Sequence, residues 1–239
     1  MCFSQNISLF MVILGSISTI ISFKYINYKA AFMIFYFTLM QIIHYLGYMV
    51  IDDCNNKLNK TLSVLNYIHI CFQPPIYLFG LWGLFDKYKI INSTQLKSFY
   101  ILLPMASVTS ILCLLQMYEF KNPILNKTDK LVTKTSSECD LCGKKCSFSG
   151  KKHIKFTLPL RKGPEYFTPG TYVHFLFFFI PLLFWNNITR LISLFMFISA
   201  FIPNVIYKLE GAETATTWCG ISIVQLILVY YFVYFYKKK

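Results

Sequence analysis

The chain has 239 residues, of which 56% are apolar, 18% aromatic and only 14% charged, and its formal net charge is +13. Soluble domains average about a quarter charged residues, so this composition excludes an ordinary soluble domain, a disordered chain and a disulfide-rich miniprotein. The positive charge comes from lysine, because Arg161 and Arg190 are the only arginines. Arginine is the usual reader of phosphates and base edges, so we expect no nucleic-acid partner.

Seven long apolar segments contain none of the 23 basic and 10 acidic residues. In chain order they are Ile7–Phe23, Ala30–Val50, Leu62–Leu84, Tyr100–Met117, Pro169–Trp185, Leu191–Tyr207 and Trp218–Tyr236. Each is long enough to cross a bilayer as a helix, which takes about 17–25 residues. In hydrocarbon the backbone must satisfy its own hydrogen bonds, which favours helices. We therefore predict an all-α polytopic transmembrane helical bundle of about seven spans, in contact with the lipid bilayer.

The predicted bundle is divided by one long connection. Residues 1–117 hold spans one to four, residues 118–168 form a 51-residue loop that contains cysteines, and residues 169–239 hold spans five to seven. We use "loop face" for the side with the N-terminus, residues 51–61, residues 118–168 and residues 208–217.

The distribution of lysine and arginine predicts the orientation. The connections and tail opposite the loop face carry nine basic residues, whereas the loop face carries three outside the long loop. The positive-inside rule then places the N-terminus outside or lumenal and the C-terminus in the cytosol. The long loop adds eleven basic residues, which leaves the reverse orientation open. Five glycosylation sequons lie on both faces and do not decide between the two: Asn6, Asn59, Asn92, Asn126 and Asn187.

Polar side chains in or beside the spans are the first candidates for a functional site, because they are expensive in a membrane. The candidates nearest the loop face are His44, Asp52, Asn66, His69, Gln73, His174, Glu213, Trp218 and Ser222. At 1.5 Å per residue, the three histidines lie roughly 8–11 Å below that face. We predict that they share a polar pocket opening toward the long loop, beside a helix kink at Pro74 and Pro75.

Three interpretations of the pocket stay open. The histidines could serve packing alone, in a purely structural protein. They could bind a ligand or ion, or carry protons, in a receptor or transporter. They could also hold zinc in an intramembrane metal-dependent hydrolase acting on a lipid-like substrate, with three histidine ligands, a carboxylate base and an activated water.

A second cluster lies in the long loop. Cys139, Cys142, Cys146 and His153 form the pattern C-x2-C-x3-C-x6-H, a donor set that suits tetrahedral zinc. In an oxidising compartment the same thiols would form disulfides, with Cys54 or Cys2 as partners. Either way we expect the cluster to hold the loop together. The remaining cysteines lie in the predicted spans and are expected to pack: Cys71, Cys113 and Cys219.

Several stretches resemble an uncharacterised family of multi-spanning membrane proteins found in giant DNA viruses and some microbes. The stretches read YIHICFQP from Tyr67, CDLCGKKC from Cys139, KHIKFTLPL from Lys152, YFTPGTYVHFLFFFIPLL from Tyr166 and ETATTWCGISIVQ from Glu213. Gly170 and Thr214 depart from the family pattern, where serine and tryptophan are expected. The resemblance implies no established activity, but it implies a host endomembrane or virion membrane. It also marks a set of positions: His69, Gln73, Pro74, His153, Pro159, Pro169, His174, Glu213, Trp218 and Cys219.

Overall fold

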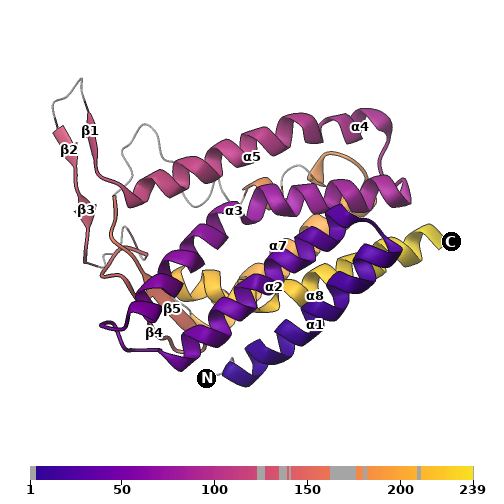
Figure 1. Ribbon diagram of the computed structural model, residues 1–239. Coiled ribbons are helices and arrows are strands. Elements are labelled where there is room, and N and C mark those ends of the chain that lie inside the picture. Colours follow the sequence, from indigo (N-terminus) through magenta and orange to yellow (C-terminus); the bar gives the residue numbers. More distant parts are fainter. Residues whose placement is uncertain are drawn as a thin grey trace.

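A computed structural model describes residues 4–122, 127–134, 139, 141–161, 176–179, 182–208 and 211–238. Long helices lie side by side in a bundle, and short strands gather at one end of it (Figure 1). The helices are α1 Gln5–Tyr25, α2 Tyr28–Met49, α3 Lys57–Tyr88, α4 Ser93–Lys97, α5 Phe99–Leu114, the 3-10 turn η1 Leu115–Met117, α7 Asn187–Tyr207 and α8 Gly211–Lys238. The strands are β1 Phe120–Asn122, β2 Lys127–Asp129, β3 Leu131–Val132, β4 Cys146–Ser149, β5 Ile154–Thr157 and β6 Leu160–Arg161.

Among the described residues, five helical stretches are long and apolar enough to cross a membrane. They are Gln5–Tyr25, Tyr28–Met49, Lys57–Tyr88, Ser93–Met117 and Thr216–Lys237, and they match the first four predicted spans and the last. The sixth predicted span falls in α7, where Asn187–Ile202 is a shorter apolar helix. The fifth, Pro169–Trp185, lies largely outside the described residues together with His174. The total of seven spans therefore stays a prediction.

The first helix packs on the second through small residues. The buried side of α1 consists of Ser8, Gly15 and Ser22, one residue every seven. A Cβ atom built on Gly15 would stand 2.1 Å from the hydroxyl oxygen of Thr38, so only glycine permits this approach. Small residues at such intervals let membrane helices come close together. The outer side of α1 is apolar and exposed, with Phe10 59% exposed, which is compatible with contact with lipid.

The third helix forms the centre of the bundle. Its side chains Tyr77, Leu78, Leu81 and Phe85 are completely buried. The helix continues without a break through the Pro74–Pro75 pair, and Figure 1 shows it bending midway. Proline lacks the N–H that an α-helix needs and crowds the preceding turn, which accounts for the bend.

The long loop contains β structure, which the all-α expectation left out. Three separate two-stranded antiparallel sheets form in its described part: β1 with β2, β3 with β6, and β4 with β5. In the last pair Cys146 faces Thr157 and Ser149 faces Ile154. The β4–β5 hairpin lies against the ends of α2, α3 and α8, and it covers the loop face of the bundle there. This hairpin determines the geometry of the candidate site.

Candidate functional site

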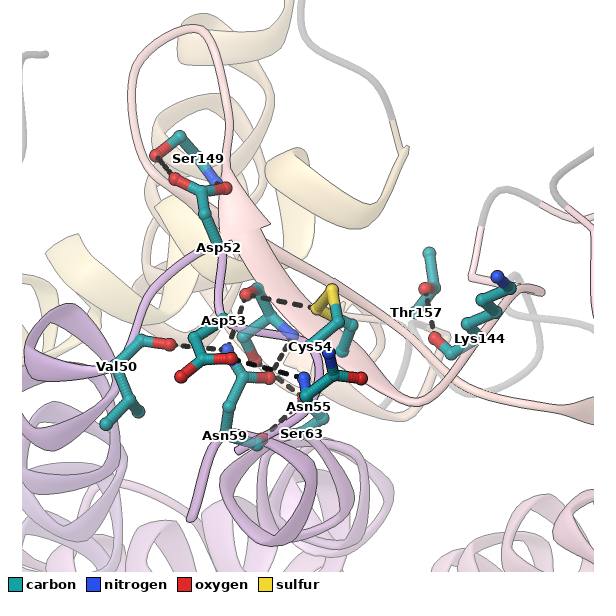
Figure 2. Close-up of a disulfide and its surroundings, with 12 residues drawn as sticks. Val50, Asp52, Asp53, Cys54, Asn55, Asn59, Ser63, Lys144, Ser149 and Thr157 are labelled. Atoms are coloured by element: carbon teal, nitrogen blue, oxygen red, sulfur yellow. Dashed lines mark hydrogen bonds between the residues drawn. A yellow bond between two sulfur atoms is a disulfide. The ribbon is translucent and has the colours of Figure 1, made fainter. Parts of the chain in front are cut away.

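The first strand of the hairpin is fixed to the start of α3 by one side chain. The Asn59 amide donates to the carbonyl oxygens of Ser147 (2.8 Å) and Val50 (2.7 Å), and its oxygen accepts from the Ser147 N–H at 2.7 Å. Asn59 is completely buried, and it pairs with β4 as a neighbouring strand would (Figure 2). The Ser63 and Ser147 hydroxyls add a bond of 2.8 Å one turn further along α3.

A disulfide and a carboxylate reinforce the same attachment. Cys54, in the α2–α3 connection, is bonded to Cys146 at the start of β4, 92 residues away in sequence. At the other end of β4, the Asp52 carboxylate accepts from the Ser149 N–H (2.9 Å) and hydroxyl (2.7 Å), as Figure 2 shows. Asp52 has a φ of 67°, in the left-handed region, and its own N–H donates to Ser147. The α2–α3 connection therefore holds β4 at both of its ends.

The turn of the hairpin is fixed to the first turn of α8. The Glu213 carboxylate accepts the N–H groups of Lys152 and of His153, the latter at 2.8 Å. A Cβ atom on Gly150 would stand 2.6 Å from the carboxyl carbon of Glu213, so this turn requires glycine. One turn along α8, the Thr216 hydroxyl donates to the Ile154 carbonyl at 2.5 Å. Glu213 is thus a buried anchor for the turn.

His153 points from the hairpin into the bundle. The Tyr48 hydroxyl lies 2.6 Å from its Nδ1, and its ring stands perpendicular to the His44 ring with centroids 4.8 Å apart. Burial lowers the pKa of the His153 imidazole to about 3, although a backbone contact with Thr216 acts in the opposite direction. At neutral pH the ring is therefore uncharged, with its proton on one of the two nitrogens, and its Nδ1 shares a hydrogen bond with the Tyr48 hydroxyl.

A second polar group, deeper in the bundle, centres on Cys219. Its carbonyl oxygen accepts from the Gln41 amide and from the Ser222 hydroxyl, both at 2.7 Å. Its sulfur accepts from the Gln73 amide at 3.0 Å. Cys219, which the sequence indicated only as a packing residue, therefore joins α2, α3 and α8. The Cys71 and Cys113 side chains are also buried.

His69 belongs to this deeper group. Its Nε2 lies 2.6 Å from the carbonyl oxygen of Tyr36, which can only accept, so the ring proton is on Nε2. Its Nδ1 is then the acceptor for the Gln73 amide at 3.3 Å. The Tyr36 ring stacks on the imidazole at 4.0 Å, and the Tyr36 hydroxyl donates to the His69 carbonyl. Both nitrogens of His69 thus have partners.

Along α2, α3 and α8, buried polar atoms that lack partners lie between the residues of these two groups. In the described part of the chain, no hydrogen bond reaches either ring nitrogen of His44, the side-chain oxygen of Asn66 or the hydroxyl of Thr217. All three side chains are at most 2% exposed. His44 is on α2, Asn66 on α3 and Thr217 on α8. Each lies along its helix between a residue that contacts the hairpin and a residue of the Cys219 group. We call His44, Asn66 and Thr217 the unpaired layer.

The structure therefore distributes the predicted pocket residues over several places. His44 and Asn66 lie in the unpaired layer, whereas His69, Gln73 and Ser222 belong to the Cys219 group. Asp52 and Glu213 hold the hairpin. The Trp218 indole donates to Gln225 at 3.1 Å, and Gln225 donates to Ser199 of α7. The β4–β5 hairpin contacts α2, α3 and α8 on the side where the pocket was expected to open, and the pocket itself stays a prediction.

Sequence reasoning did not single out the residues that hold the hairpin on α3. Asn59, Ser63, Asn66 and His69 follow one another at steps of four, three and three, a single helical stripe. Extending the predicted polar stripe of the third span toward its N-terminus would have found Asn59 and Ser63. Tyr36, Ser147 and Thr217 carry no comparable signal, because their roles depend on contacts that are distant in sequence.

The loop cysteines form disulfides. Cys139 is bonded to Cys142, and Cys146 to Cys54, one of the two partners expected for the disulfide alternative. Because three of the four proposed zinc ligands are used in this way and His153 faces Tyr48, the C-x2-C-x3-C-x6-H set is not assembled as a zinc site. In the described ranges, no group of three or more His, Cys, Asp or Glu side chains is placed to hold a metal ion.

A family model for a family of unknown function, DUF5765, matches residues 6–237. No curated protein and no solved structure matches the chain. The family description names no activity, in agreement with the resemblance to an uncharacterised family, and it leaves the giant-virus origin a prediction. Since the match runs from the first turn of α1 almost to the end of α8, the chain belongs to the DUF5765 family of unknown function.

Proposed function

We propose that this chain is a multi-pass integral membrane protein that binds a small polar ligand or ion in the unpaired layer. One observation carries the proposal: His44, on α2, is completely buried, and both of its ring nitrogens lack partners among the described residues. A buried polar group without a hydrogen bond costs about 1–3 kcal/mol. Buried polar groups are therefore almost always paired, and an exception calls for an explanation such as a bound ligand.

The chemistry of the layer narrows the ligand class. A neutral imidazole offers one donor and one acceptor, the Asn66 oxygen accepts, and the Thr217 hydroxyl does both. These groups suit a small molecule with its own N–H or O–H groups, or a cation coordinated by oxygen and nitrogen. The layer holds no described carboxylate, so the site favours a neutral ligand or a monovalent ion over a multivalent one.

The metal-dependent hydrolase remains the alternative. It requires His44, His69 and His174 to converge, but both nitrogens of His69 already have partners and His174 lies outside the described residues. A purely structural role is the remaining possibility. It predicts that the unpaired layer only lowers stability, so that apolar replacements would stabilise the protein.

Two observations support the same orientation of the chain. Disulfides persist in oxidising compartments, so Cys54–Cys146 and Cys139–Cys142 favour a loop face that is lumenal or outside. The lysine and arginine count favours the same side for the N-terminus. We propose this orientation, with a host endomembrane or a virion membrane as the location. A membrane-impermeant thiol reagent, applied to intact membranes after mild reduction, tests it by labelling Cys54.

The binding proposal is tested by thermal unfolding of the purified protein in detergent. The probes are Na+, K+, ammonium, Zn2+ and imidazole, each measured on wild type and on His44→Leu, Asn66→Leu and Thr217→Val. We expect at least one probe to raise the melting temperature of the wild type and to do so much less in the three variants. Ser193→Ala, which removes a buried hydroxyl of α7 far from the layer, is the matched control and keeps the response.

The outcomes separate the alternatives. If no probe stabilises the wild type and all three variants are more stable than it, the binding proposal is refuted and the structural role stands. If Zn2+ alone stabilises the protein and His69→Ala abolishes that effect, the hydrolase replaces it.

A further inference from the structure

A second feature of the bundle is an apolar groove lined by residues of α1, α2 and α3. Figure 1 shows that α1 ends and α2 begins at the end of the bundle away from the strands. The volume of the groove is about 490 Å³. The residues that line it are Thr19, Phe23, Tyr28, Ala31, Phe32, Phe35 and Phe79. Because Phe23 is 69% exposed and Phe32 and Phe35 are each 45% exposed, the groove opens on the outer surface of the bundle.

The groove runs along the direction of a lipid tail. Its lining on α2 extends from Tyr28 to Phe35, eight residues, which is about 10 Å of helix. Both α1 and α2 are long and apolar enough to cross a membrane, and an apolar opening between such helices suits an acyl chain. Tyr28, at the outer end of the groove, is an aromatic residue of the kind enriched where the membrane meets water.

A positive charge is held at the outer end of the groove. The Lys29 ammonium lies 3.2 Å from the centroid of the Trp82 ring and 5.7 Å from that of Phe79, which lines the groove. The backbone of α3 permits this position, because a Cβ atom on Gly83 would stand 2.6 Å from Lys29 Cβ. Lys24, on the last turn of α1, adds a second positive charge near the same end.

The groove thus offers an apolar surface for the acyl chain of a lipid, and Lys29 and Lys24 supply positive charge where the lipid headgroup would lie. We propose that the groove binds an anionic glycerophospholipid, with one acyl chain along Phe32 and Phe35 and the phosphate beside Lys29 and Lys24. Anionic lipids attract lysine near the membrane surface and are abundant in the cytoplasmic leaflet, the side to which the lysine count assigns this end. This site is independent of the unpaired layer.

Native mass spectrometry of the full chain in detergent tests the proposal, with palmitoyl-oleoyl phosphatidylglycerol and the matching phosphatidylcholine as probes. We expect the wild type to bind phosphatidylglycerol at least tenfold more tightly. Lys29→Gln should reduce the preference for phosphatidylglycerol to within threefold, whereas Phe35→Ala should weaken the binding of both lipids. Lys97→Gln removes an exposed lysine at the same end but outside the groove, and it should leave the preference unchanged.

Three results would overturn the proposal: equal binding of both lipids by the wild type, an equal loss in Lys97→Gln and Lys29→Gln, or displacement of the lipid by free glycerol phosphate. If Lys29→Gln does not fold, the salt dependence of lipid binding by the wild type still tests the proposal. Raising the salt from 50 to 500 mM must then remove most of the preference for phosphatidylglycerol, because that preference is electrostatic.

Discussion

Replacing Asn59 by leucine removes the side chain that serves three backbone groups at the junction of α2, α3 and β4. The Ser147 N–H loses its partner outright, which costs about 2 kcal/mol for a buried amide. The carbonyl oxygens of Ser147 and Val50 each lose one donor. Ser147 keeps the bond from Asp52, so we assign about half a kcal/mol to each carbonyl. The total loss is about 3 kcal/mol.

Hydrogen exchange measures this loss where it occurs. A local cost of about 3 kcal/mol makes the hairpin open roughly a hundred times more often, so the amides of β4 and β5 exchange faster by that factor. Helices distant from the hairpin, such as α7, keep their wild-type exchange. Thr61→Ala destroys the same Asn-Lys-Thr sequon but leaves the three bonds of Asn59, and it controls for any effect of glycosylation. A change of less than threefold in Asn59→Leu would show that this attachment does not hold the hairpin.

Three more predictions follow from the same geometry. His153 has a folded-state pKa of about 3 against about 6.5 unfolded, so its contribution is complete above pH 6.5 and is lost as pH falls toward 3. The free energy of unfolding, measured with denaturant, should therefore decrease as the pH falls over this range. His153→Phe should make that pH dependence flatter. Cys54→Ser opens a link between segments 92 residues apart and should cost up to about 4 kcal/mol, measured by the same unfolding. Gly15→Ala places a methyl group against Thr38 and should cost about 1–3 kcal/mol, which Thr38→Ala partly restores.

The long apolar helices could be predicted from composition alone, because apolar runs without charge favour helices. The first and last residues of each helix were harder to predict. The third span was expected to start at Leu62, but α3 begins at Lys57, where Asn56 caps it. Its first turn is polar because it lies against the hairpin. Hydropathy detects only the apolar part of such a helix.

The candidate site was predicted only in part, because its geometry depends on the hairpin. His44, Asn66 and Glu213 could be identified as unusual polar residues beside the spans. Their partners could not, since His153 approaches His44 only after β4 and β5 fold back onto the bundle. The C-x2-C-x3-C-x6-H spacing grouped His153 with the cysteines. Spacing along a chain does not reveal that the hairpin turns this side chain inward.

The bond from Gln41 to the Cys219 carbonyl has a consequence for biosynthesis. The two residues are 178 positions apart. At about 5–20 residues per second, Gln41 is synthesised roughly 10 to 35 seconds before its partner exists. During that interval the amide, like the His44 ring three residues further along α2, must find other partners such as water. The last helix therefore completes the polar interior, and a ribosome that stalls before α8 leaves a bundle whose buried polar groups are incompletely paired.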